Sequence, residues 1–284
     1  MLPSWEEFGL QFASGGGLRS AVPALPREVM RVRLTIAYDG RPFAGWQSQP
    51  GGNTVQDLLE AAVGRILKTE QPVAVHGSGR TDAGVHALGQ VAHVDVPDTC
   101  RMDVAAWRRA LNGQLPPAIR VLAVARAADE FHARFQAAGK TYRYRIWNDE
   151  VLPPLEAGLA WQMPHRMDFT GLEAACRLCE GRRDFSAFAA NRCDGKDANR
   201  DKVRELFRVK LEHAAPLITL TFHGSGFLYK MVRLLTGSMV RVARGREPLS
   251  WLAHLLTAPP GEKSHHTAPA DGLYLVSVDY AADA

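Results

Sequence analysis

Two side chains that could do chemistry, Arg80 and Asp82, lie two residues apart in the glycine-rich stretch GSGRTDAG, residues 77–84. A carboxylate can act as a base or a nucleophile, and an arginine head is planar and permanently charged. The three glycines indicate a backbone that turns tightly or comes close to another group. Alone, the stretch fits two interpretations: a chemical site open to the backbone of an RNA, or a turn that Asp82 caps and Arg80 bridges.

Other chemistries built on glycine loops or carboxylates do not fit these residues. A dinucleotide fingerprint G-x-G-x-x-G would need glycine at position 82, and a helix after it, whereas the following residues alternate as in a strand. The sequence contains no G-x-x-x-x-G-K-[ST] phosphate loop. A hydrolytic glycosidase uses two carboxylates, and the stretch has only one. Nucleotide binding and glycoside hydrolysis are therefore disfavoured here.

Apolar periodicity predicts the elements that position this stretch. Residues 31–38 alternate apolar and polar side chains, which predicts a half-buried strand. Thr54 is a good N-cap for the amphipathic helix that follows it. Further strands are predicted over 90–96, 119–126, 140–147, 217–223 and 273–280, and further helices from Asp103, over 169–180 and from Phe227. Because strand often follows strand directly, the predicted fold class is α+β.

The chain divides into an extension and two halves. Residues 1–29 contain three consecutive glycines and three prolines without sustained periodicity, which predicts a flexible N-terminal extension. Met30 stands directly before the first strand and is a second candidate start. Two similar α+β halves are predicted over 30–150 and 151–284, and the first half carries the Asp82 loop.

Composition places the chain among globular proteins: 284 residues, 46% apolar and 23% charged. No apolar run could span a membrane, and the N-terminus lacks the pattern of a secretory signal, so we expect a cytoplasmic protein. Cys176 and Cys179 lie at helical spacing with Leu172, which favours a place in the core over a metal site.

The net charge of +4 is small, but basic residues gather in two segments, 192–210 and 241–246. Such segments could follow a phosphate backbone, as an RNA-binding face would. A solvated helix face would have the same composition, so charge alone leaves both interpretations open.

The segment GRTDAGVHALGQVAHV (79–94) strongly resembles the active-site motif of the tRNA pseudouridine synthase A (TruA-type) family. Other segments resemble further signatures of that family in the same order: YDGRPFAGWQSQP and TVQDLLE within 38–60, KTYRYRIWN (140–148), DFSAF (184–188), FLYKMVRLLTGSM (227–239) and APADGLYLVSVDY (268–280). The resemblance covers residues 31–281, leaving 1–29 without a counterpart. Lys230 departs from the family pattern, in which histidine or asparagine is often found.

The resemblance implies a pseudouridine synthase fold, with largely antiparallel sheets flanked by helices. It implies isomerisation of uridine to pseudouridine in the tRNA anticodon stem-loop, at positions 38 to 40, without cofactor or metal. Asp82 would be the catalytic aspartate, Arg80 the base-flipping or site-organising arginine, and Tyr142 the tyrosine beside the target base. Arg233 would pair with the aspartate. The implied partners are tRNA and a second copy of the chain, as a homodimer.

The residues suit that chemistry, which breaks the N1–C1′ bond and joins C5 to C1′ without oxidation. A carboxylate could attack C1′, add to the base or remove the 2′ proton, and these routes stay open. Arg233 would favour the charged form of Asp82 in a dry pocket, or else bridge to a surface acid. Tyr142 could stack on a base or belong to the core, and the K-T-Y pattern favours it over Tyr144 for stacking.

Two other functions remain open. A non-catalytic tRNA-binding or tRNA-folding module would keep the basic segments and Tyr142 but make Asp82 structural. An isomerase or glycosidase of free nucleosides would act without RNA and show little sensitivity to salt.

Overall fold

The computed structural model describes residues 29–191, 201–257, 259 and 261–281, and over these ranges the strands form a single sheet of ten. The main strands are β1 (Val29–Tyr38), β3 (His86–Pro97), β4 (Ile119–Arg126), β5 (Ala137–Trp147), β7 (Gly181–Asp184), β8 (Val203–Ala214), β9 (Leu217–Gly224) and β10 (Leu273–Tyr280). Their order is β4-β1-β3-β10-β5-β9-β8-β7, and β2 (Val75–Gly77) and β6 (Trp161–Gln162) pair with β3 and β5. Neighbours run antiparallel except at the pairs β3–β10 and β5–β6. The predicted α+β class is confirmed.

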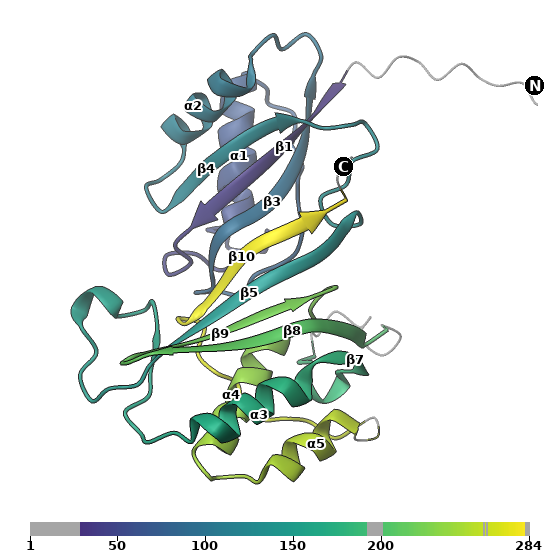
Figure 1. Cartoon of the computed structure of the whole chain (residues 1–284). Helices are drawn as coiled ribbons and strands as arrows, with labels where there is room; N and C mark the ends of the chain where they lie inside the picture. The colour runs from purple at the N-terminus through teal and green to yellow at the C-terminus, as the bar shows by residue number, and fades with distance from the viewer. Residues whose placement is uncertain (1–28, 192–200, 258, 260, 282–284) are drawn as a thin grey trace, which may run out of the picture.

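Helices gather in two groups, one beside each end of the sheet (Figure 1). The first group, α1 (Val55–Leu67) and α2 (Val104–Gln114), lies beside β1, β3 and β4, and the second lies beside β7, β8 and β9. The second group consists of α3 (Phe169–Cys179), α4 (Met231–Ala243) and α5 (Leu249–Thr257). No helix within the described ranges has the length and apolar composition needed to cross a bilayer.

Local sequence signals explain where most helices begin. Thr54 and Asp57 form a capping box at the start of α1, and the Asp103 side chain caps α2.

Cys176 and Cys179 on α3 are buried, as the structural interpretation predicted, and burial raises the pKa of both thiols. The prediction of a helix from Phe227 was wrong by four residues, because α4 begins at Met231, after a residue in the left-handed region.

The first strand begins two residues before its predicted start. β1 includes Val29, so this residue belongs to the sheet, and the remainder of the predicted extension, residues 1–28, lies outside the described residues. Along β1 the side chains of Val32, Leu34, Ile36 and Tyr38 are buried, as the alternation predicted.

The two halves share the sheet, and the last strand of the chain lies at its centre. β10 pairs with β5 along its length and joins β3 through the parallel pairs Tyr274–His86 and Leu275–Ala87. β5 precedes residue 150 but pairs with β9 of the second half. The predicted division near residue 150 therefore separates segments of sequence that contribute to one continuous sheet.

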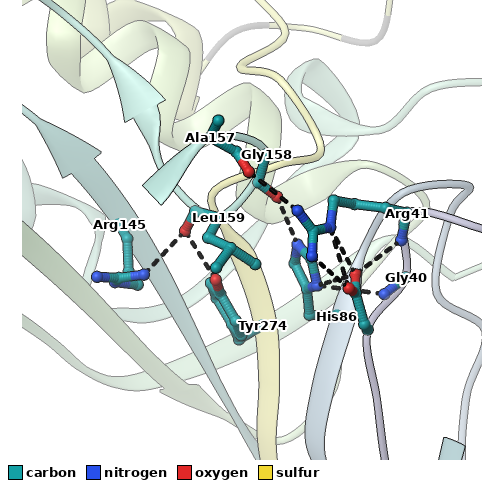
Figure 2. Close-up of polar contacts among 9 residues, drawn as sticks. Gly40, Arg41, His86, Arg145, Ala157, Gly158, Leu159 and Tyr274 are labelled. Atoms are coloured by element: carbon teal, nitrogen blue, oxygen red, sulfur yellow. Dashed lines mark hydrogen bonds and ion pairs between the residues drawn. The ribbon is translucent and has the colours of Figure 1, made fainter. Parts of the chain in front are cut away.

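A seam of hydrogen bonds anchors the segment between β5 and β6, which we call the linker between the halves. The carbonyls of residues 157–159 each accept a bond: Arg41 Nη1 reaches the first at 3.0 Å, His86 Nε2 the second at 3.1 Å, and Tyr274 Oη and Arg145 Nη1 the third at 2.7 and 3.1 Å (Figure 2). The backbone N–H of residue 40 donates to Nδ1 of His86 at 3.2 Å, so the imidazole carries its proton on Nε2 and donates to the linker. We call these contacts the linker seam.

Candidate active site

The Asp82 loop connects β2 to β3 and is held by bonds from buried polar residues. Ser78 Oγ donates to Gln90 Oε1 at 2.7 Å, and Gln90 Nε2 donates to the carbonyl of Gly79 at 2.9 Å. The hydroxyls of Tyr38 and Thr81 are 2.8 Å apart. Burial raises the pKa of Tyr38 to about 12, so its phenol stays protonated and can donate. The loop is therefore fixed on both sides of its arginine.

Two glycines of the loop leave space for side chains from other parts of the protein to pack against its backbone. A Cβ on Gly77 would collide with the Trp46 ring, and one on Gly79 would lie 2.7 Å from Nζ of Lys140. Gly84 has φ +79°, a conformation that other residues rarely adopt. The loop was expected to be bare so that an RNA backbone could approach, but at Gly77 and Gly79 the close approach is made within the fold.

Asp82 and Arg233 form an ion pair, although 151 positions separate them in the chain. Arg233 Nη1 donates to Asp82 Oδ2 at 2.7 Å, and Arg233 Nε donates to the carbonyl of Ala268 at 2.8 Å, which fixes the guanidinium. The side chain of Asp82 is 17% exposed and that of Arg233 is 14% exposed. No residue of the described ranges donates a hydrogen bond to Asp82 Oδ1. The carboxylate thus has one oxygen held by a cation and one oxygen open to a ligand.

Arg80 does not bridge to Asp82. Its Nε donates to Oε1 of Gln47 at 3.1 Å, at an exposed position. The alternative in which Arg80 merely closes a turn with the aspartate therefore finds no support in the structure. The side chain is held at the rim of the site, with most of its donors available.

The two tyrosines of β5 differ as the sequence indicated. Tyr144 is fully buried, and its hydroxyl donates to the carbonyl of Pro269 at 2.8 Å. Tyr142 is 7% exposed and meets Phe227 edge to face, with ring centroids 4.9 Å apart. Burial, the charge of Asp82 and the nearby Tyr38 raise the pKa of Tyr142, so it stays a neutral phenol.

A cavity of about 340 Å³ brings the predicted residues together. Asp82, Arg80 and Tyr142 all line it, and Arg233 holds the aspartate through the ion pair. Other lining residues include Trp46, Gln47, His132, Arg134, Phe135, Lys140, Phe227 and Lys230. The basic members of this lining outnumber its single carboxylate, which suits an anionic ligand.

Lys140 is a site residue that the sequence analysis did not identify. Its Nζ donates to the carbonyl of Ser78 at 2.7 Å. Its pKa is lowered to about 8, mainly by burial and to a smaller extent by the charge of Arg134. A signal was present, because Lys140 and Tyr142 are two apart on β5 and therefore face the same side of the sheet.

The structure describes the two basic segments only in part. Residues 192–200 of the first segment lie outside the described residues. In the second, Arg241 forms an ion pair with Glu247 at 2.9 Å. Across the described residues, no group of three or more His, Cys, Asp or Glu side chains is placed to hold a metal ion.

The tRNA pseudouridine synthase family matches residues 34–136 and 175–281, and the chain belongs to that family. Among individual proteins, the chain is similar to tRNA pseudouridine synthase A of Akkermansia muciniphila. The two sequences are 49% identical over 253 residues, which cover 88% of this chain and 95% of the relative. The proteins of the same name from Syntrophotalea carbinolica and Solibacter usitatus are 42% and 43% identical, each over 88% of this chain and 96% and 99% of the relative. The chain is accordingly an isomerase that makes pseudouridine.

Proposed function

We propose that this enzyme isomerises uridine to pseudouridine at positions 38 to 40 of the tRNA anticodon stem-loop, with Asp82 as its catalytic residue. The observation that carries the proposal is the open Oδ1 of Asp82 in a cavity of about 340 Å³, beside an arginine that balances the charge. Tyr142 forms a wall against which the uracil rests, and Arg80 lies at the rim.

The reaction needs a carboxylate, a shielded site and room to turn a base. The N1–C1′ bond breaks, the detached uracil rotates, and C5 joins C1′; C5 then loses its proton and N1 gains one. Oδ1 of Asp82 serves equally for attack at C1′, addition to the base or removal of the 2′ proton. Tyr142 and Phe227 cover the site from water, which would otherwise hydrolyse the detached sugar.

The target uridine must leave its stack to reach Asp82, at a cost of a few kcal/mol. Arg80 is placed to offset that cost, because among the described residues its guanidinium is held only by Gln47 and can bind a flanking phosphate. Lys140 has further ammonium donors beyond its bond to the carbonyl of Ser78. The substrate is therefore a polynucleotide, and free uridine would lack these phosphate contacts.

The proposal includes a homodimer that acts on tRNA in the cytoplasm. An anticodon arm is large relative to one 31.2 kDa chain that must both grip it and position one uridine. Light scattering of the protein with and without tRNA measures this: a mass of two chains is expected, and a single-chain mass in both samples contradicts it.

The decisive experiment is pseudouridine formation in an unmodified tRNA transcript with uridines at 38, 39 and 40. We expect product at those positions with no added metal or nucleotide, and none when they are replaced by cytidine. Asp82→Asn should lower the rate by at least about 1000-fold. Asp98→Asn, a matched change at a carboxylate 65% exposed on the surface, should not.

Each other outcome selects an alternative. Tight, salt-sensitive tRNA binding without product would favour the tRNA-binding module. Product from free uridine, insensitive to salt, would favour an enzyme of free nucleosides. Full activity in Asp82→Asn would remove Asp82 from the mechanism.

A further inference from the structure

Phe135 is a large apolar side chain left 75% exposed in the segment between β4 and β5. Single exposed apolar residues are ordinary on protein surfaces, and Leu155 and Val151 of the linker are exposed to a similar extent. Phe135 differs from both because it lines the same cavity as Asp82. Its exposure therefore falls at the entrance of the active site.

The segment holding Phe135 is anchored by buried side chains and hydrogen bonds. Phe131 and Ala133 are buried in a small cluster with Val91, and Tyr280 Oη donates to the carbonyl of Ala133 at 2.6 Å. The next backbone N–H groups, at residues 134 and 135, point to Nδ1 of His132 at 3.1 and 3.4 Å. The phenyl ring is thus presented to solvent from a fixed backbone, a favourable state for stacking since little order is lost on binding.

The surroundings of the ring are aromatic and basic. Its centroid lies 4.2 Å from that of His132, with the planes 35° apart, and the guanidinium of Arg134 lies 5.7 Å from the ring centroid. No carboxylate of the described residues forms an ion pair with Arg134, and its charge lowers the pKa of the nearby Lys140. An aromatic face next to unneutralised cations is the combination that binds a base together with its phosphate.

We propose that Phe135 and Arg134 form a second RNA subsite, where the nucleotide next to the target uridine stacks on Phe135 and its phosphate contacts Arg134. The inference rests on the proposed function, in that the uridine entering the cavity belongs to an RNA chain. When that uridine turns out of its stack, the neighbouring base loses a stacking partner, and Phe135 replaces it. The subsite recognises a base face and is tolerant of sequence.

A double-mutant cycle between protein and RNA tests the stack. Phe135→Ala should weaken tRNA binding by about 10-fold. A tRNA with an abasic nucleotide on one side of the modified uridine, each side tried in turn, should bind wild type about 10-fold more weakly. The same abasic tRNA should bind Phe135→Ala no more weakly than intact tRNA does.

Three controls interpret the cycle. Phe135→Trp should retain the affinity of wild type because it keeps an aromatic face. Leu155→Ala truncates another exposed apolar side chain, away from the cavity, and should change nothing. Equal losses from the abasic change in wild type and Phe135→Ala, on both sides, would overturn the proposal, as would an unchanged affinity in Phe135→Ala. The uridine that the wild-type enzyme modifies decides where the abasic nucleotide is placed. If that uridine lies outside the anticodon arm, the proposed substrate is wrong, and the stacking proposal is then tested beside the uridine that is modified.

Arg134 gives an independent readout through salt. Arg134→Gln should reduce the slope of log affinity against log salt concentration by roughly 0.7 to 0.9, the value of one phosphate contact. Arg177→Gln removes an equally charged residue on α3 that already pairs with Glu173, and should leave the slope unchanged. An unchanged slope in Arg134→Gln would remove the phosphate contact from the proposal.

Discussion

The cavity and the linker seam both join the two halves of the sequence, and they do so in opposite ways. In the seam, three consecutive carbonyls receive four donors, and the ring of His86 also stacks on Tyr274 with centroids 4.6 Å apart. In the cavity, the part of the chain that the structure describes leaves one oxygen of Asp82 without a donor and gives Arg80 a single hydrogen bond.

This difference separates stability from function. Satisfied hydrogen bonds each contribute about 1 kcal/mol and hold a geometry, which is what the seam does for the linker. Donors and acceptors at the cavity that the protein does not use can bind a ligand. Variants in the cavity should therefore change the reaction, and variants in the seam should change the unfolding free energy.

Arg233 gives the first test of this contrast, in the cavity. Arg233→Met removes the charge beside Asp82 and should lower the single-turnover rate on tRNA by at least about 100-fold, the usual cost of losing a charge-stabilising group. The far-ultraviolet circular dichroism should match wild type, because α4 keeps its apolar contacts. A rate within a few-fold of wild type would show that Asp82 works without its cation and would break the contrast between the two regions.

Whether a feature of the fold or the site could be predicted from the sequence depends on how far apart its residues lie along the chain. The capping box of Thr54 and Asp57 is local and was half predicted, from Thr54 alone. The pairing of Asp82 with Arg233 spans the fold, so no periodicity could indicate it, and it was expected only through the family resemblance. The linker seam was missed because its acceptors are backbone carbonyls, which every residue possesses.

Lys140 sharpens the contrast as an exception in the cavity, because its burial lowers its pKa and therefore also affects stability. Its pKa of about 8 in the folded protein lies below the usual lysine value of 10.5, so between these pH values the unfolded chain binds more protons than the folded one. The unfolding free energy attributable to Lys140 should therefore rise with pH from 8 to 10.5, by up to about 3 kcal/mol. Denaturant titrations of Lys140→Met should lack this rise relative to wild type. Lys210→Met, a change at a lysine 52% exposed, should keep it.

His86 tests the seam. His86→Ala removes the acceptor of the residue 40 N–H and the donor to residue 158, and leaves a void where the ring stacked on Tyr274. We expect a loss of about 2 to 3 kcal/mol in unfolding free energy, measured by denaturant titration, with the single-turnover rate at 25 °C within about 3-fold of wild type. A rate loss as large as that of Arg233→Met, with stability retained, would place His86 in the reaction instead.

The smallest effect is expected from Tyr274→Phe, which deletes a single hydroxyl of the seam. The carbonyl of Leu159 loses the 2.7 Å bond from this phenol but keeps the bond from Arg145 at 3.1 Å, so no acceptor is left empty. The loss should be about 1 kcal/mol, less than for His86→Ala, and the affinity for tRNA should not change. A loss above that of His86→Ala would mean that the strength of the seam lies in its β10 side, where Tyr274 pairs with β3, and that the imidazole is secondary. Thermal unfolding of the two variants side by side decides between these arrangements, because each removes a different one of the bonds that hold residues 157–159.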